Sequence, residues 1–270
     1  MIRLEHLHKR FNSGTTNEVY PLRDVNLEIK EGDFITVIGT NGSGKSTLLN
    51  VIAGAFSPDS GKIFVAGDEV TQKKDFERAK YISRVFQNPF MGTAPEMTLA
   101  ENLLMAILRG GKHTPKISLN AGRLSYFRSE LAKLEMGLED RLDTVIGTLS
   151  GGQRQAVTLL MAVIKEPKVL LLDEHTAALD PKSAAQVIQL TRTFIEEKTL
   201  TTLMVTHSMQ QALDLGSRTI MMHRGQIIDD ISEKEKRRLT VNDLLEKFAQ
   251  LRKSEKLTEE MIEQLRREYL

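Results

Sequence analysis

The stretch that decides the fold is Gly39-Thr40-Asn41-Gly42-Ser43-Gly44-Lys45-Ser46-Thr47. An apolar run, residues 34–38, precedes it, and an apolar segment with helical character, residues 48–53, follows it. This order predicts a strand, a glycine-rich loop and a helix. Glycines let successive backbone N–H groups turn inward, and the helix N-terminus adds the positive end of its dipole. The stretch is therefore expected to bind an anion such as a phosphate group.

The spacing of the loop fits the phosphate-binding P-loop pattern, with Gly39, Gly44, Lys45 and Ser46 at the fixed positions. Lys45 supplies a full charge to the outer phosphates of a nucleotide, and the Ser46 hydroxyl can ligate Mg²⁺. The alternative is a Gly- and Ser-rich turn without a ligand, which the flanking strand and helix disfavour. The candidate nucleotide-binding residues are Gly39, Asn41, Gly42, Ser43, Gly44, Lys45, Ser46 and Thr47.

Composition narrows the class of protein. Of 270 residues, 37 are Lys or Arg and 36 are Asp or Glu, a balance that does not indicate a nucleic-acid or membrane-surface protein. The chain has no cysteine, which excludes disulfides and thiolate metal sites. No secretory leader and no run of about 20 apolar residues is visible. We therefore expect a cytoplasmic chain, and any membrane span would belong to another chain.

Strand-like and helix-like segments follow one another in an order that predicts an α/β fold. The expected strands are residues 2–11, 24–29, 34–38, 62–65, 81–86, 169–172 and 203–206, with a further pair around 218–228. Between about 88 and 165 strand patterns give way to helical ones, including a helix at about 122–136, which predicts an inserted helical subdomain. Strands that alternate with helices predict a parallel sheet.

The C-terminal segment, residues 231–270, is dense in charge and carries apolar residues at helical spacing. These are Val241, Leu244, Leu245, Phe248 and Leu251 in one stretch and Leu257, Met261, Leu265 and Tyr269 in the next. The spacing predicts two amphipathic helices. They either pack on the surface of this chain or mediate a contact with another chain.

A second phosphate-binding turn, Leu149-Ser150-Gly151-Gly152-Gln153, narrows the family. Ser150 offers a hydroxyl, and Gly151 and Gly152 offer unobstructed N–H groups at the start of a helix. No Asn is followed by Lys, so the guanine-reading motif of GTPases is missing. The turn resembles the LSGGQ signature of ATP-binding cassette (ABC) ATPases, and the resemblance covers about residues 1–230.

The resemblance implies an α/β P-loop NTPase core of the RecA-like kind. It further implies an antiparallel β subdomain, the inserted helical subdomain and a short C-terminal helical tail. The ABC ATPase domain would span residues 1–230 and the helical extension residues 231–270. ATP and Mg²⁺ are the implied cofactors. Two copies would form a head-to-tail dimer that holds ATP between the loop 39–47 of one copy and Ser150, Gly151, Gly152 and Gln153 of the other.

An acidic pair, Asp173 and Glu174, ends an apolar strand, where α/β sheets bind their ligands. It resembles the Walker B site, which implies that Asp173 holds Mg²⁺ through water and that Glu174 polarises the attacking water. His207 ends the next strand and resembles the switch histidine that contacts the γ-phosphate. Gln87 resembles the Q-loop glutamine, which contacts Mg²⁺ and water. Lys45 completes the implied catalytic set.

Three further positions come from the resemblance. Asp180 lies in a segment that resembles the D-loop, which communicates between the two sites. Phe11 stands at the position of the aromatic residue that stacks on adenine, with a buried core phenylalanine as the alternative and Tyr20 as a second candidate. His175 departs from the pattern, since most relatives carry proline there. Because Glu174 is retained, hydrolysis should persist.

The leading function is the ATP-hydrolysing subunit of a membrane transporter at the cytoplasmic face of the membrane. The Asp-Glu-His form of residues 173–175 resembles ATPases of bacterial solute importers, including importers of aromatic amino acids. A Gly-Glu-x-Gly element of drug exporters before residue 149 and a regulatory β domain after residue 230 are both missing. These features favour import of a small solute, such as an amino acid, over export.

The expected partners are a second copy of the chain, separate permease subunits and an extracytoplasmic solute-binding protein, without nucleic acid. The permease would dock near residues 88–97, where Phe90 and Met91 could meet a helix, unless these residues pack against the insert. The alternative function is a soluble ABC ATPase acting on DNA or ribosomes. Neither the long coiled coil of repair types nor a second P-loop is present. A nucleotide sensor without catalysis is disfavoured, since Lys45, Asp173, Glu174 and His207 are intact.

Overall fold

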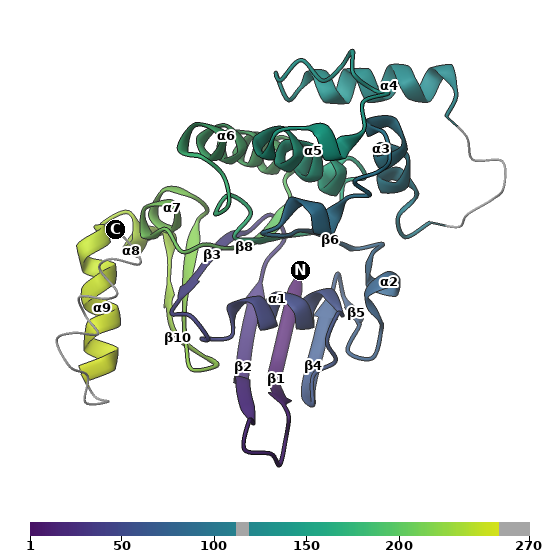
Figure 1. The fold of residues 1–270 in the computed structure, drawn as a ribbon. Helices are drawn as coiled ribbons and strands as arrows, with labels where there is room; N and C mark the ends of the chain where they lie inside the picture. Colours follow the sequence, from purple (N-terminus) through teal and green to yellow (C-terminus); the bar gives the residue numbers. More distant parts are fainter. Residues whose placement is uncertain (112–118, 254–270) are drawn as a thin grey trace.

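The computed structural model describes residues 1–111 and 119–253. Its strands are β1 (Ile2–Phe11), β2 (Val19–Ile29), β3 (Phe34–Gly39), β4 (Ser60–Val65), β5 (Asp68–Glu69), β6 (Ile82–Val85), β7 (Val169–Asp173), β8 (Thr201–Val205), β9 (Arg218–His223) and β10 (Gln226–Ile231). Its helices are α1 (Lys45–Ala53), α2 (Asp75–Arg78), α3 (Leu99–Leu108), α4 (Ala121–Ala132), α5 (Gly151–Val163), α6 (Pro181–Lys198), α7 (Met209–Asp214), α8 (Glu233–Lys236) and α9 (Val241–Lys253), with short 3-10 turns at Pro89–Gly92 and Ile146–Thr148. Figure 1 shows their arrangement.

A six-stranded sheet forms the centre of the described chain, in the order β10-β9-β3-β8-β7-β6. Its strands are parallel except for the β9–β10 hairpin, which confirms the predicted parallel sheet. In the pairing register, Val37 lies opposite Val205, and Val205 lies opposite Asp173. The carboxyl ends of β3, β7 and β8 therefore meet at one edge, which is where ligands bind in such sheets.

A second sheet is antiparallel and has the order β2-β1-β4-β5. It is the antiparallel subdomain that the family resemblance implied. Helix α1 lies between the two sheets (Figure 1), and its apolar residues share one buried cluster with residues from both. The strand predicted at 24–29 is longer and begins at Val19. His6 and Asp24 adopt positive φ values of 49° and 54°, and the β1–β2 register shifts along the pair. These irregularities break the alternation that strand prediction relies on.

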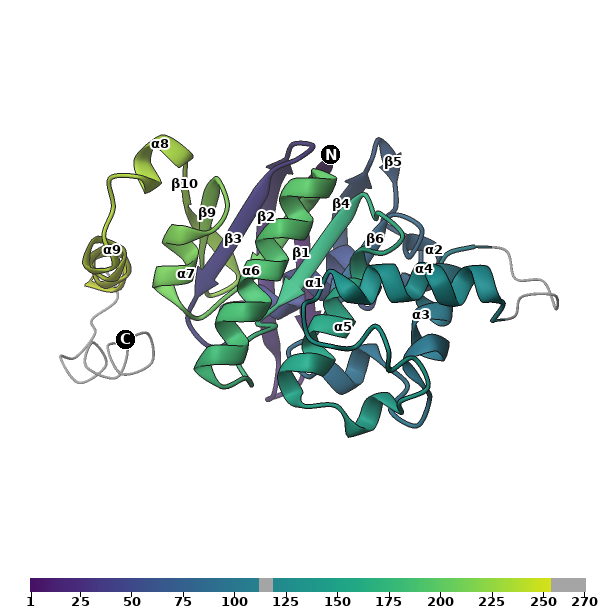
Figure 2. The ribbon, with the colours of Figure 1, turned by 90° about the horizontal axis from the view of Figure 1, so that it is seen from above.

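The helical part of the chain, from Pro89 to Val163, contains α3, α4 and α5. Thr98 is the N-cap of α3 and forms a capping box, in which its hydroxyl accepts a hydrogen bond from the Glu101 N–H at 3.2 Å. The helix predicted at about 122–136 ends earlier, because α4 stops at Ala132 and Glu135 has a φ of 53°. In the view of Figure 2, α3 and α4 lie at one end of the molecule and α9 at the other.

Helix α9 packs on the surface of its own chain, which was one of the two alternatives for the C-terminal segment. Its residues Leu244 and Phe248 are buried in a cluster with Met209 of α7 and Ile231 of β10. The Lys247 Nζ lies 2.8 Å from Asp229 Oδ2 and 3.0 Å from Glu235 Oε1. The second predicted tail helix, with Leu257, Met261, Leu265 and Tyr269, lies outside the described residues. Over residues 1–111 and 119–253, no helix has the length and apolar character to cross a membrane.

Candidate active site

Two glycines of the loop between β3 and α1 lie where a side chain would collide with neighbouring backbone. Gly44 has a φ of 103°, and a Cβ there would lie 2.1 Å from the Pro21 carbonyl oxygen. A Cβ on Gly39 would lie 2.3 Å from the carbonyl oxygen of Met222. The Lys45 Nζ donates to the carbonyl oxygens of Gly39 (2.6 Å) and Thr40 (3.2 Å). The loop is thus closed tightly around a lysine, as phosphate binding requires.

A cavity of about 260 Å³ opens in front of this loop. It is lined by Phe11, Val19, Pro21, Asn41, Gly42, Ser43, Gly44, Lys45, Ser46, Thr47 and Glu174. The Phe11 ring meets the ring of Phe56 edge-on, with 5.2 Å between centroids. The Tyr20 ring instead stacks on His8, with 6.0 Å between centroids, and carries the Arg10 guanidinium at 4.3 Å. Of the two aromatic candidates, the structure brings Phe11 to the cavity.

Oxygen ligands for a divalent cation meet at the start of α1. The Ser46 hydroxyl donates to Asp173 Oδ1 at 3.1 Å, joining the P-loop helix to the end of β7. Hydroxyl and carboxylate oxygens are the ligands that Mg²⁺ prefers, so the two residues fit this ion. Gln87 lies exposed in the bend after β6 and is not among the described residues lining the cavity. The structure therefore brings Ser46 and Asp173 together and leaves Gln87 apart.

Glu174 lines the cavity and contacts His207, with 2.5 Å between Oε1 and Nε2. The Glu174 side chain is 11% exposed and that of His207 32%. Glu174 adopts a φ of 47°, a conformation that non-glycine residues adopt rarely and at an energetic cost. Its N–H is fixed by a 3.0 Å hydrogen bond to the Val205 carbonyl oxygen. The backbone thus turns sharply where the carboxylate reaches the cavity.

The signature turn begins α5 and lies apart from the cavity of the same chain. Ser150 is the N-cap, and its Oγ accepts a hydrogen bond from the Gln153 N–H at 3.2 Å. Gly151 is exposed, and a Cβ on Gly152 would lie 2.7 Å from the Ser183 Oγ of α6. Residues 150–153 are not among those lining the P-loop cavity. The two candidate anion-binding turns of the chain therefore do not line the same cavity.

Asp180 is the N-cap of α6. Its Oδ1 accepts a hydrogen bond from the Ser183 N–H at 3.1 Å. Hydrogen bonds from the Ser183 side chain and backbone hold the pKa of Asp180 below its usual value. The D-loop residue is therefore a negatively charged helix cap, and Ser183 links it to the α5 segment that carries the signature turn.

Comparison with known proteins decides the family. The ABC transporter family model matches residues 22–177. The chain belongs to the ABC transporter family. This ABC ATPase is 42% identical over 250 residues to the tyrosine transport ATP-binding protein of Clostridioides difficile strain R20291, covering 92% of this chain and 98% of that protein. It is 33% identical over 239 residues to a phosphonates import ATP-binding protein of Lactococcus lactis, covering 85% and 92%.

Solved structures agree with this assignment. A dimeric ATP-binding cassette in a post-hydrolysis state, bound to ADP and Pi, matches the ABC ATPase with a TM-score of 0.74 and 30% identity. The match covers 86% of this chain and 99% of that one. The predicted family, the fold with its antiparallel and helical subdomains, and the ATPase activity are therefore confirmed.

Sequence reasoning missed one charged residue of the ABC ATPase site. Arg84 projects from β6, and its Nη2 lies 2.6 Å from Asp173 Oδ2. The Arg84 Nη1 donates to Asn50 Oδ1 on α1 at 2.6 Å. The available signal was a lone charge in the otherwise uncharged strand segment 82–86, three residues before Gln87.

Proposed function

We propose that this ABC ATPase hydrolyses Mg²⁺–ATP at two sites in a head-to-tail dimer, each completed by the signature turn of the other copy. The observation that carries this is the separation of the two anion-binding turns within one chain. The P-loop cavity contains the lysine and carboxylate of the site, while Ser150–Gln153 starts a helix elsewhere on the surface. The dimeric form of a similar cassette supports the same arrangement.

Each group at the cavity has a role in this proposal. The N–H groups of residues 41–47 and the Lys45 ammonium bind the phosphates, and the Phe11 ring stacks on adenine. Ser46 and Asp173 would hold Mg²⁺, which offsets phosphate charge when bound. The predicted contact from Gln87 would require this exposed side chain to approach the cavity, which it does not line in the structure. Glu174 orients and polarises the attacking water. His207 holds the Glu174 carboxylate and contacts the γ-phosphate.

The transport role follows from the family and its relatives. Relatives of this chain are ATP-binding proteins for tyrosine transport and for phosphonates and methionine import. We propose that this subunit drives import of a small solute, with an aromatic amino acid as the first candidate. It would lie at the cytoplasmic face of the membrane, beside permease subunits that receive the solute from an extracytoplasmic binding protein.

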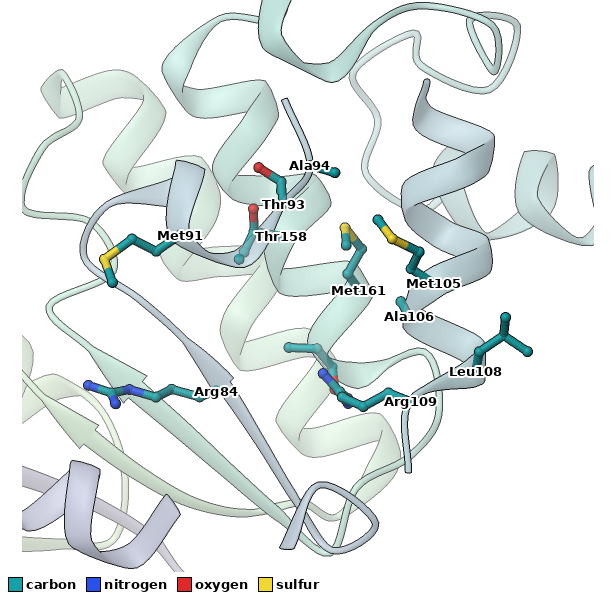
Figure 3. A pocket seen from close by; sticks show the side chains of 12 residues that line it. Arg84, Met91, Thr93, Ala94, Met105, Ala106, Leu108, Arg109, Thr158 and Met161 are labelled. Atoms are coloured by element: carbon teal, nitrogen blue, oxygen red, sulfur yellow. The ribbon is translucent and has the colours of Figure 1, made fainter. Parts of the chain in front are cut away.

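A groove beside the predicted docking segment 88–97 suits the permease contact. It has a volume of about 630 Å³ and is lined by residues that include Met91–Ala94, Met105 of α3 and Met161 of α5 (Figure 3). Met91 is 68% exposed and Phe90 45%, although the Phe90 ring also faces the Arg154 guanidinium at 3.8 Å. Methionines adapt to irregular apolar partners. We propose that a permease helix binds here.

The proposed division of the chain places the ATPase domain at residues 1–230, with the helical subdomain at about 88–165. Residues 231–270 form a C-terminal extension. In the described part of this extension, α9 covers α7 and the β9–β10 hairpin. Helix α9 lies at the end of the molecule away from α3 and α4 (Figure 2).

Solute uptake in cells tests the proposed function. Host cells that lack this chain are complemented with the wild type or with Lys45→Ala, and uptake of labelled tyrosine, methionine and a phosphonate is measured. The wild type should restore uptake of tyrosine, and Lys45→Ala should not, because it lacks the phosphate-binding charge. Full restoration of uptake by Lys45→Ala would contradict an ATP-driven role. If the wild type restores uptake of methionine or a phosphonate instead, that solute replaces tyrosine as the proposed substrate.

A further inference from the structure

Arg84 is a charged side chain held almost entirely inside the protein. It projects from β6, the edge strand of the six-stranded sheet, and its side chain is 12% exposed. Its guanidinium lies 2.6 Å from Asp173 Oδ2 on β7 and donates to Asn50 Oδ1 on α1, also at 2.6 Å. One side chain thus joins three elements that meet at the metal side of the ATP site.

The two carboxylate oxygens of Asp173 have different partners. Oδ2 accepts from Arg84, and Oδ1 accepts from the Ser46 hydroxyl at 3.1 Å. The Asp173 side chain is only 11% exposed, so water offers few alternatives to these two bonds. The guanidinium therefore fixes the orientation of the carboxylate, with one oxygen bonded to Arg84 and the other facing Ser46. A carboxylate held in this way needs no reorientation when a cation arrives.

We propose that Arg84 is a positioning residue for the metal side of the ATP site. It holds Asp173 with Oδ1 toward Ser46, so that the carboxylate is oriented for Mg²⁺–ATP. The inference rests on the proposed function, because Ser46 and Asp173 are the proposed metal side. Arginine suits this task, since its planar fork can bond Asp173 and Asn50 at the same time and keeps its charge. A lysine has a single ammonium at the end of a flexible chain and cannot reproduce that fork.

The same arginine belongs to the wall of the groove beside segment 88–97. Arg84 and Arg109 both line it, and Figure 3 shows them at separate places, Arg84 on β6 and Arg109 just after α3. The Arg84 guanidinium carbon lies 4.6 Å from the centroid of the Phe86 ring, next to Gln87. Its Nε has no hydrogen-bond partner among the described residues. The arginine that contacts Asp173 can therefore also contact a partner that binds in the groove.

Arg109 offers a matched control for Arg84. It lines the same groove and donates to the Ser83 hydroxyl and, at 3.2 Å, to the Ala162 carbonyl oxygen. Burial lowers its pKa, as expected for a guanidinium without a carboxylate partner. Arg109→Lys thus makes the same chemical change in the same groove. The hydrogen bonds of Arg109 go to β6 and α5, whereas those of Arg84 go to α1 and β7.

The test measures ATP affinity with and without Mg²⁺, using a fluorescent ATP analogue and the full chain, first in EDTA and then in excess Mg²⁺. Arg84→Lys should lose about tenfold or more of the affinity that Mg²⁺ adds, while the affinity in EDTA stays at the wild-type value. Arg84→Gln should show the same loss, and Arg109→Lys should keep the full Mg²⁺ effect.

Two results would overturn the positioning role. One is an Arg84→Lys protein that keeps the full Mg²⁺ effect. The other is an equal loss of affinity in EDTA and in Mg²⁺, which indicates a general defect of the pocket. A wild-type protein that gains no affinity from Mg²⁺ would overturn the metal site itself, and the positioning role with it. Melting temperatures of the variants without nucleotide show whether each one is folded.

Discussion

His175 lies between the candidate catalytic carboxylate of Glu174 and the D-loop, with 1% of its surface exposed. Its Nε2 is 3.0 Å from the Thr191 hydroxyl oxygen, and that hydroxyl donates to the Val187 carbonyl oxygen at 2.8 Å. Because the hydroxyl proton is used, the hydroxyl can only accept from His175, and the imidazole proton must be on Nε2. Burial lowers the pKa of His175 to about 4. The residue is therefore a neutral donor inside the fold.

This buried histidine predicts an acid-sensitive step in stability. Its pKa falls from 6.5 to about 4 on folding, so the unfolded chain binds the proton more readily. Stability should be full above pH 6.5 and should fall as the pH decreases toward 4, by about 3 kcal/mol from this group. His175→Gln keeps a donor for Thr191 but does not titrate, so its decline should be smaller. Urea unfolding at a series of pH values measures this, and parallel curves for both proteins would contradict it.

Individual residues of the site differ in how much the sequence could reveal. The P-loop glycines, Lys45 and Ser46 carry their function in local spacing, because loop, strand and helix are neighbours in the chain. Arg84 could not be found in that way. Its partner Asp173 is 89 residues away, and they meet only because β6 pairs with β7, with Arg84 opposite Leu171. A lone charge in a strand of the sequence looks the same whether it faces water or a buried carboxylate.

At the scale of elements, the C-terminus of the P-loop helix α1 has an unusual cap. Arg78, 1% exposed, donates through Nη1 to the carbonyl oxygens of Val51 and Ile52, both at 2.8 Å. Its other nitrogens donate to the carbonyl oxygens of Thr71 (3.0 Å) and Lys73 (2.8 Å). Burial lowers the pKa of Arg78 to about 10, so it stays charged at pH 7. A cation at the end of a helix also interacts favourably with its dipole.

Removing this cap should destabilise the whole nucleotide-binding half of the molecule. Arg78→Met leaves four buried carbonyl oxygens without this donor, and we expect a loss of about 3 kcal/mol in the free energy of unfolding. Arg78→Lys keeps the charge but not the four bonds, so its loss should be intermediate. Urea unfolding at pH 7 measures both variants. A methionine variant as stable as the wild type would show that water satisfies these carbonyls.

Element boundaries were harder to predict than element types. The strands and helices of the core follow from apolar patterns such as residues 169–172, which are buried on both faces. Strand β2 begins at Val19, five residues before the predicted start. The prediction missed these residues because Pro21 and a bulge at Asp24 hide the alternation of apolar and polar side chains. The pairing of β2 with β1 stabilises these residues, and a local pattern cannot report a pairing partner.

At the scale of the whole molecule, the chain presents two halves of one kind of site. The P-loop cavity is lined by Lys45, Ser46 and Glu174, and Ser46 and Glu174 contact Asp173 and His207, respectively. The signature turn at Ser150 is exposed at the start of α5 and is not among the residues that line this cavity. In the proposed dimer, a second copy in head-to-tail orientation would supply the signature turn as the second wall of each phosphate site.

The most direct test of this composite site is the oligomeric state of Glu174→Gln with Mg²⁺–ATP, measured by gel filtration with light scattering. Without the carboxylate, ATP should persist and hold two copies together. We therefore expect a dimer with ATP and a monomer without nucleotide. Adding Ser150→Arg to the same chain should abolish the dimer, because the larger cation blocks the signature turn. A Glu174→Gln protein that stays monomeric with saturating ATP, and hydrolyses it at the wild-type rate, would contradict the composite ATP site.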